Sequence, residues 1–249
     1  MLRKNILITG ASSGLGEGMA REFAAKGRNL ALCARRTERL LALKAELEGK
    51  HPGIRVLVKP LDVNDADAVF KTFRQFADEL GSLDRVIVNA GVATGRRVGT
   101  GNFEANARTA QTNFLAALAQ CEAAVEIFRK QGQGHLVAIS SMSALRGLPK
   151  HLTVYAATKA GLATLAEGIR AELLATPIKV STIYPGYIRT ELNAGAKKLP
   201  FEVDARTGSA ALAKAIEREP AKAYVPSWPW MLVGGLLRVM PLSLVAKFA

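Results

Sequence analysis

Short apolar runs alternate with longer amphipathic stretches along most of this chain. Seven runs rich in Val, Ile and Leu predict β-strands, at 5–10, 29–34, 54–59, 84–89, 134–140, 178–184 and 223–226. Apolar residues at helical spacing between them predict helices, at about 15–26, 36–48, 65–80, 104–130, 153–175 and 204–218. Strands that are apolar on both faces and separated by helices are typical of a parallel sheet covered on both sides. We therefore predict an α/β fold, a doubly wound Rossmann-type three-layer sandwich with a mostly parallel seven-stranded sheet, in one domain over 1–249.

Composition narrows the classes of protein that fit this pattern. Hydrophobic residues make up 49% and charged residues 22% of the chain, as in globular proteins. Cys33 and Cys121 both fall in apolar runs, which predicts reduced, buried thiols in a cytoplasmic protein rather than a disulfide framework. The N-terminal apolar stretch is too short for a signal-peptide core, and no run is long enough to span a bilayer.

The net charge of the chain adds little to the prediction of its binding partners. The net charge is +13, but the basic residues are dispersed and no nucleic-acid motif accompanies them. We therefore expect no nucleic-acid partner. His51 and His135 have no neighbouring ligand residues, so we expect no metal site either.

A glycine-rich turn follows the first predicted strand. In "TGASSGLGEGM", Gly10, Gly14 and Gly16 precede a helix, and Ser12 and Ser13 can cap that helix or contact a phosphate. Glycines permit a tight turn and a close approach of the backbone, and a helix N-terminus offers free N–H groups to a pyrophosphate. The turn therefore predicts dinucleotide binding.

The end of the second strand indicates which dinucleotide is bound. Sheets that bind NAD carry an acidic residue there, which holds the ribose 2′-hydroxyl. This chain has Ala34 at that place, followed by Arg35 and Arg36. Two guanidinium groups suit a 2′-phosphate, so the sequence favours NADP(H) over NAD(H).

A tyrosine and a lysine stand four residues apart in "YAATK". If this segment is helical, Tyr155 and Lys159 share one face. A nearby ammonium group stabilises a phenolate and lowers the pKa of the phenol, which makes proton transfer feasible near neutral pH. We therefore predict that Tyr155 is a general acid and base.

Seven landmarks now stand in one order along the chain: "TGASSGLG" at 9–16, "LDV" at 61–63, "NAG" at 89–91, Asn113, "ISS" at 139–141, "YAATK" at 155–159 and "PGYIRT" at 185–190. In these residues the chain resembles the short-chain dehydrogenase/reductase family, over at least residues 5–190. The resemblance implies an NADP(H)-dependent oxidoreductase that transfers hydride between the nicotinamide and a carbonyl or secondary alcohol. A catalytically silent NADP(H)-binding regulatory protein on the same fold is the alternative.

The resemblance also implies roles for individual residues. Tyr155 would be the general acid/base, and Lys159 would bind the nicotinamide ribose and lower the pKa of the tyrosine. Ser141 would hydrogen-bond the substrate oxygen, and Asn113 would anchor a water in a proton relay. Ser143 is a second candidate for the serine, because the spacing from Ser141 to Tyr155 is one residue longer than the family pattern.

Further residues would contact the cofactor. Asp62 would contact the adenine amine, Asn89 and Gly91 would form a wall beside the cofactor, and Ile188 and Thr190 would hold the nicotinamide amide. The complete expected set is Gly10, Ser12, Ser13, Gly14, Leu15, Gly16, Arg35, Arg36, Asp62, Val63, Asn89, Ala90, Gly91, Tyr155, Lys159, Pro185, Gly186, Ile188 and Thr190. The family's "NNAG" reads "VNAG" here, which removes one polar side chain.

The last third of the chain leaves alternatives open. We expect a substrate lid at about 187–218. Arg96, Arg97, Lys197 and Lys198 indicate either an anionic small-molecule substrate or a solvated rim.

The apolar segment at about 223–249 holds both tryptophans and is interrupted by prolines and Arg238. It predicts a homo-oligomer interface (dimer or tetramer), with a lid over the substrate site or a peripheral membrane contact as alternatives.

Overall fold

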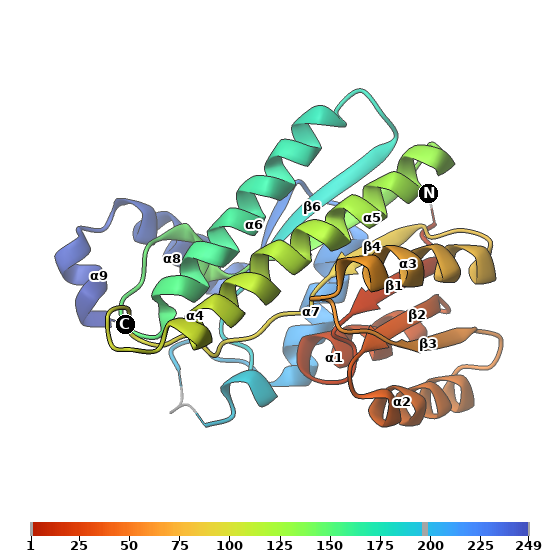
Figure 1. The fold of residues 1–249 in the computed structure, drawn as a ribbon, viewed down its shortest axis with the longest axis horizontal. Helices are drawn as coiled ribbons and strands as arrows, with labels where there is room; N and C mark the ends of the chain where they lie inside the picture. The colour runs from red at the N-terminus through yellow and green to blue at the C-terminus, as the bar shows by residue number, and fades with distance from the viewer. Residues whose placement is uncertain (1, 196–198, 249) are drawn as a thin grey trace.

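The computed structural model describes residues 2–195 and 199–248. Within them, one parallel sheet of seven strands has the order β3-β2-β1-β4-β5-β6-β7 (Figure 1). The strands are β1 (Asn5–Thr9), β2 (Asn29–Ala34), β3 (Val56–Pro60), β4 (Arg85–Val88), β5 (Gly134–Ile139), β6 (Ile178–Pro185) and β7 (Lys222–Val225). The strand order reverses between β1 and β4, which is where such sheets bind ligands. The predicted Rossmann-type fold and its seven parallel strands are confirmed.

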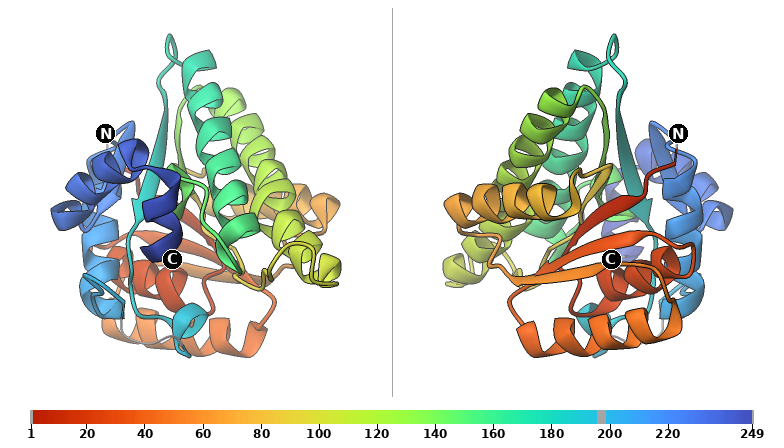
Figure 2. Two further views of the ribbon diagram at one scale, coloured as in Figure 1. Left: turned by 90° about the vertical axis from the view of Figure 1, so that its left-hand side faces the viewer. Right: turned by 90° about the vertical axis from the view of Figure 1, so that its right-hand side faces the viewer.

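Helices cover both faces of the sheet (Figures 1 and 2). One layer contains α1 (Gly14–Ala24), α2 (Thr37–Lys50) and α7 (Ala205–Glu217). The other contains α3 (Ala66–Leu80), α4 (Phe103–Ala110), α5 (Ala116–Gln131) and α6 (Leu152–Glu172). The helix predicted at 104–130 is interrupted by a π-helical segment, η1 (Gln111–Leu115), which joins α4 to α5.

The core follows from the alternation of side chains along each strand. Successive residues of a strand point to opposite faces, so Leu7 packs into the cluster beneath α3, α5 and α6. Ile6 and Ile8 pack into the cluster beneath α1, α2 and α7. All three are fully buried. Runs that are apolar at every position, rather than at every second one, are therefore what this sheet requires.

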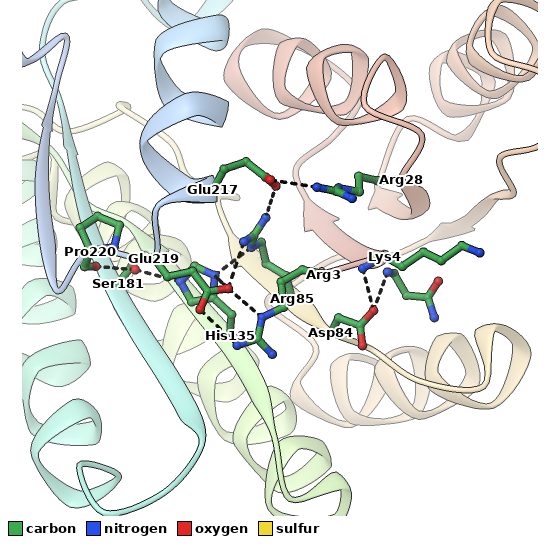
Figure 3. A network of polar contacts seen from close by, with 11 residues as sticks. Arg3, Lys4, Arg28, Asp84, Arg85, His135, Ser181, Glu217, Glu219 and Pro220 are labelled. Carbon is green, nitrogen blue, oxygen red and sulfur yellow. Dashed lines mark hydrogen bonds and ion pairs between the residues drawn. The ribbon is translucent and has the colours of Figure 1, made fainter. Parts of the chain in front are cut away.

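Polar contacts tie the amino ends of the strands together (Figure 3). Arg85, at the start of β4, binds Glu217 at 2.6 Å and Glu219 at 3.3 Å. Its Nε donates to Nδ1 of His135 at 2.8 Å, and Nε2 of His135 lies 2.8 Å from Oγ of Ser181. Both ring nitrogens of His135 therefore have hydrogen-bond partners in this cluster. The described residues contain no group of three or more His, Cys, Asp or Glu residues that could hold a metal ion.

The C-terminal segment folds into two helices that the periodicity did not predict. They are α8 (Ser227–Val239) and α9 (Leu242–Phe248), and they lie together at one end of the molecule (Figures 1 and 2). Trp230 and Val245 are buried, whereas Trp228 is 71% and Val239 is 78% exposed. The segment thus has an inner and an outer apolar face. None of the described helices is long and apolar enough to cross a membrane.

The region of the predicted lid, 187–218, has two parts. Its second part is α7, in which Leu212, Ala213 and Ile216 are fully buried against the sheet. Its first part includes a short 3-10 helix, η3 (Glu191–Asn193), and a β-bridge between Ile188 and Val203. Within 187–218, this first part is the portion of the described chain that does not belong to the helical layer.

Candidate active site

The glycine turn after β1 is a close-packed cradle. Gly10 has φ +65°, and a Cβ on it would lie 2.9 Å from Cα of Ala90. A Cβ on Gly16 would lie 2.4 Å from the carbonyl oxygen of Gly10. Side chains at these two positions would therefore displace the backbone. The turn keeps its shape because it has no side chains there, which leaves the backbone open to a ligand.

The N-terminus of α1 opens onto this cradle. Ser13 stands at its N-cap position, but its side chain makes no capping hydrogen bond. Instead, Oγ of Ser13 accepts from Nη2 of Arg36 at 2.6 Å, and Oγ of Ser12 accepts from Nε of Arg36 at 3.3 Å. Uncapped N–H groups, a helix dipole and a guanidinium group together form a site for anionic oxygens. The phosphates of a dinucleotide fit these groups.

A carboxylate is bound to the same guanidinium group. Glu191, in η3, accepts from Arg36 at 3.1 Å and from Arg39 at 2.6 Å. The hydrogen bonds from Arg39 and Arg36 hold the pKa of Glu191 below its ordinary value. Arg35 is exposed. The loop after β6 is thus linked to the predicted 2′-phosphate site.

Residues after β3 and β4 continue the site along the sheet. The amide nitrogen of Asn89 donates from its side chain to the carbonyl oxygen of Thr9 at 2.9 Å, and this joins β4 to β1. Asp62 is exposed and accepts from the backbone and side chain of Asn64, at 3.0 and 2.9 Å. Val63 beside it is buried.

Asn113 is fully buried in the π-helical segment. Its side chain exchanges two hydrogen bonds of 2.8 Å with the backbone of Val92 and lies 3.4 Å from Oγ1 of Thr158. These contacts occupy the side chain of Asn113. A π-helical segment changes the backbone hydrogen-bond pattern locally, and such segments are frequent at functional sites.

Tyr155 and Ser141 are hydrogen-bonded to each other. Burial raises the pKa of Tyr155, and the bond to Ser141 opposes that rise only in part. The sequence predicted a lowered pKa for this phenol, and the direction in the structure is the opposite because burial dominates. Of the two candidate serines, Ser141 is the one hydrogen-bonded to Tyr155. The Oγ of Ser141 also accepts from the backbone N–H of Ser143 at 3.1 Å.

Lys159 is 5% exposed and lies one turn after Tyr155 in α6. Its Nζ donates to the carbonyl oxygen of Ile139 at 2.9 Å. A Cβ on Gly91 would lie 3.4 Å from this Nζ and 3.1 Å from Oδ1 of Asn113. Burial lowers the pKa of Lys159 to about 8. The structure thus brings Gly91, Asn113 and Lys159 together.

A cavity of about 300 Å³ adjoins Ser141. Pro185 and Gly186, at the end of β6, form one wall, and a Cβ on Gly186 would lie 2.1 Å from the ring of Trp230. The lining residues are Ser141, Met142, Ser143, Arg146, Leu148, Leu152, Pro185, Gly186, Tyr187, Pro200, Phe201, Trp230, Val233, Leu236, Leu237, Met240 and Val245. The inner face of the C-terminal segment contributes residues of α8 and α9 to the wall of this cavity.

Comparisons with known proteins agree with this geometry. A family model described as short chain dehydrogenase matches residues 4–199. This chain belongs to that family. This chain is 52% identical over 247 residues to a protein of Mycobacterium tuberculosis named as an uncharacterized oxidoreductase. The match covers 99% of this chain and 98% of that protein. An uncharacterized oxidoreductase of Myxococcus xanthus is 35% identical, covering 93% and 90%.

Solved structures extend the likeness to the whole fold. A short-chain dehydrogenase from Sphingobium yanoikuyae, in complex with NADPH, matches with a TM-score of 0.81 and 29% identity. The match covers 93% of this chain and 92% of the other. The present chain is therefore an oxidoreductase of the short-chain dehydrogenase family, as its motifs predicted.

Other basic residues of this dehydrogenase lie elsewhere. Arg96 and Arg97 are exposed and do not line the cavity. Lys197 and Lys198, the other two residues expected near an anionic substrate, lie outside the described residues. The sequence reading missed Arg146, which does line the cavity. The only signal was its place in the loop after the "ISS" motif, five residues beyond Ser141.

Proposed function

We propose that this protein is an NADP(H)-dependent oxidoreductase that interconverts a carbonyl group and a secondary alcohol, with Tyr155 as general acid and base. One observation carries the proposal: Tyr155 is hydrogen-bonded to Ser141, and Ser141 opens onto an apolar cavity. Small-molecule sites are cavities of this kind, mostly apolar with a few placed polar groups.

The bound nicotinamide supplies the hydride for the carbonyl carbon in reduction and accepts it in oxidation. In reduction, Ser141 donates a hydrogen bond to the carbonyl oxygen, and Tyr155 transfers its phenolic proton to that oxygen as negative charge develops there. In oxidation, the phenolate of Tyr155 accepts the proton of the alcohol. The apolar walls exclude water, which strengthens these hydrogen bonds.

Lys159 serves this chemistry through its charge. It has no carboxylate partner among the described residues, and it lies beside Gly91 at the wall of the nucleotide site. We infer that its ammonium group binds the nicotinamide ribose and favours the phenolate form of Tyr155 in the complex. Asn113 hydrogen-bonds the backbone of Val92 and also lies 3.4 Å from Thr158, the residue before Lys159 in α6.

The preference for NADP(H) rests on the end of β2. Arg36 is already held at the glycine turn by Ser12 and Ser13, and Arg35 beside it is exposed. Each charge-assisted contact to a 2′-phosphate contributes about 1.5–3 kcal/mol. One good contact therefore favours NADP(H) about 10-fold or more over NAD(H).

Cofactor titration tests this preference directly. NADPH and NADH would be titrated against the wild type and against Ala34→Asp/Arg35→Ala, which adds a repelling carboxylate and removes a cation. We expect tighter NADPH binding in the wild type and an eroded or inverted preference in the variant. Equal affinities in the wild type would overturn the NADP(H) assignment.

Turnover separates the proposed enzyme from a silent regulator on the same fold. NADPH oxidation would be followed with a panel of carbonyl compounds, and NADP⁺ reduction with the paired alcohols. An oxidoreductase consumes the cofactor with some member of the panel. A regulatory protein shows only the change in NADPH fluorescence that accompanies binding.

We also propose that the protein forms a homo-oligomer through the outer face of α8 and α9. This face exposes Trp228, Met231, Leu232 and Val239, and exposed apolar patches of this kind mark association sites. A peripheral membrane contact is the alternative, because Arg238 accompanies the tryptophan. Sedimentation with and without residues 227–249 tests the oligomer, and co-sedimentation with anionic vesicles tests the membrane contact.

A further inference from the structure

The cavity contains a cation that the proposed reaction does not use. Arg146 follows the 3-10 helix η2 (Met142–Leu145) and lines the cavity together with Ser141. Proton transfer is assigned to Tyr155, and Ser141 is assigned to the carbonyl oxygen, so the guanidinium group has no part in either step. A cation in largely apolar surroundings is unfavourable unless it is paired.

Arg146 is incompletely paired. Its Nη2 donates to the carbonyl oxygen of Met240 at 3.1 Å. Its Nε is buried and has no hydrogen-bond partner among the described residues. It forms no ion pair with a carboxylate within the described part of the chain, in contrast to Arg36 and Arg39, which bind Glu191.

The surroundings of Arg146 indicate the chemistry of what would pair with it. Met142, Leu152, Val233 and Leu237 are typical of the walls, which are mostly apolar. The polar side chains in the lining are two serines, Tyr187, Trp230 and Arg146, and Arg146 is the only cation among the described lining residues. A single cation in such walls suits a monoanion, because the second charge of a dianion would be desolvated without compensation. Arg146 lines the cavity and uses one N–H on Met240, and its planar guanidinium group is well suited to a carboxylate.

The size of the cavity limits the substrate further. A volume of about 300 Å³ lies at the lower end of ligand sites. An apolar body of that size could connect a carbonyl group at Ser141 to an anion at Arg146.

We propose that the substrate is a lipophilic ketone, or the corresponding secondary alcohol, that carries one carboxylate, and that Arg146 binds this carboxylate. The inference rests on the proposed function, because it takes the cavity as the substrate site of that reaction. Arg146 acts as a specificity-determining residue, and it takes no part in the transfer of hydride or proton.

Matched substrates distinguish this role from a structural one. Medium-chain oxo acids, with the carbonyl at successive positions, and their methyl esters would be assayed as pairs with NADPH. The wild type is expected to favour the acid over its ester. In Arg146→Met, the ratio of kcat/KM for acid over ester should fall by about 10- to 150-fold, the range of a charge-assisted hydrogen bond. Arg146→Lys should keep part of the ratio because it keeps the charge.

Two controls accompany the ratio. The hydrogen bond of Arg146 to Met240 holds the end of α8, so its loss alone should slow acid and ester equally and leave the ratio unchanged. Arg238→Met removes an arginine of α8 that binds the hydroxyl of Tyr224 at 3.1 Å and does not line the cavity. This variant should keep the wild-type ratio. An unchanged ratio in Arg146→Met would overturn the proposal.

A binding measurement keeps the proposal independent of turnover. Calorimetric titration of the wild type and of Arg146→Met with a medium-chain fatty acid, and with its methyl ester, measures carboxylate recognition without any reaction. Binding of the acid that Arg146→Met weakens at least 10-fold supports the carboxylate site even if no carbonyl is reduced, in which case the proposed function alone has failed. Equal binding of acid and ester by the wild type, beside normal turnover of neutral ketones, would overturn the inference and leave the proposed function intact.

Discussion

Lys159 and Arg85 are buried cations at opposite ends of the strands of one sheet. Arg85, at the amino ends of the strands, has a side chain that is 1% exposed and binds two carboxylates and His135 (Figure 3). Lys159, at the carboxyl ends, is 5% exposed and donates to one backbone carbonyl oxygen, that of Ile139. The buried cation at the amino ends is therefore paired with carboxylates, whereas the one at the carboxyl ends has no carboxylate partner among the described residues.

The pKa values express the same difference. Around Arg85, burial alone would raise the pKa of Glu217 and Glu219, but their hydrogen bonds and ion pairs with arginines outweigh burial and lower it. Burial, with the charge of Arg85 second, holds the pKa of His135 well below its ordinary value. Burial also lowers the pKa of Arg85, but its hydrogen bond and ion pairs with Glu217 and Glu219 oppose that fall. No carboxylate among the described residues opposes the effect of burial on Lys159, and its pKa falls to about 8. A compensated cluster stabilises the fold, whereas an uncompensated cation is left to interact with a ligand.

The largest expected effect is on catalysis, at the carboxyl ends of the strands. Tyr155→Phe removes the transferable proton and leaves the ring in place, so turnover should fall about 10²- to 10⁴-fold, which is equivalent to ~3–5 kcal/mol in the barrier. NADPH affinity should stay nearly unchanged, because the hydroxyl is assigned to proton transfer and not to holding the dinucleotide. Steady-state kinetics beside a fluorescence titration of NADPH measures both. A variant that keeps half of its activity would refute the role of Tyr155.

At the amino ends of the strands we expect a smaller effect, and on stability. Arg85→Met removes the cation that Glu217 and Glu219 share, but Glu217 keeps Arg28 and Glu219 keeps Arg3, so the free energy of unfolding should fall by about 2–3 kcal/mol. The kcat of the folded fraction should not change. Urea unfolding measures the difference against a matched control, Arg74→Met. Arg74 is 56% exposed and binds Glu126 at 3.3 Å, so its loss should change stability by less than about 1 kcal/mol.

Most features predicted from the sequence depend on residues that lie close together in the chain. The strands and most helices follow from local periodicity, and the cradle at Gly10 and Gly16 follows from a glycine pattern within one turn. The positions of Tyr155 and Lys159 follow from their spacing on a helix that does form. Each of these depends on residues that are close in sequence.

What the sequence did not predict depends on residues that only the fold brings together. The cluster at Arg85 combines side chains from β4, β5 and the end of α7, and no local pattern joins them. The upward shift in the pKa of Tyr155 arises from burial by distant segments. Trp230 reaches Gly186 across more than forty residues, so the inner face of α8 could not be told from its outer face.

A smaller difference should separate the two serines beside the cavity. Ser141→Ala removes a hydroxyl that contacts Tyr155, and kcat should fall on the order of 100-fold, as with the loss of one oxyanion-hole donor. Ser143 offers its backbone N–H to Ser141, and Ser143→Ala keeps that N–H, so kcat should change little. Parallel kinetics of the two variants with one substrate checks the ranking. The reverse ranking would assign the substrate oxygen to Ser143.

The smallest effect should have the opposite sign to that of Arg85→Met. The pKa of Lys159 falls from 10.5 to about 8, and this corresponds to about 3 kcal/mol of destabilisation at neutral pH. Lys159→Met removes that destabilisation but also the hydrogen bond to Ile139, which offsets about 1–2 kcal/mol of it. We therefore expect the variant to lose turnover and to gain about 1–2 kcal/mol in the free energy of unfolding at pH 7.

The pH dependence of this gain identifies its cause. Below pH 8, Lys159 is protonated in the folded and the unfolded chain, so the advantage of Lys159→Met is constant. Between pH 8 and 10.5 the folded wild type has lost this proton while the unfolded chain keeps it, so the wild type becomes more stable relative to the variant as pH rises. Urea unfolding of both proteins at pH 7 and pH 9 should show the gap narrowing. A variant that is less stable than the wild type at pH 7 would mean that Lys159, like Arg85, is a compensated part of the fold.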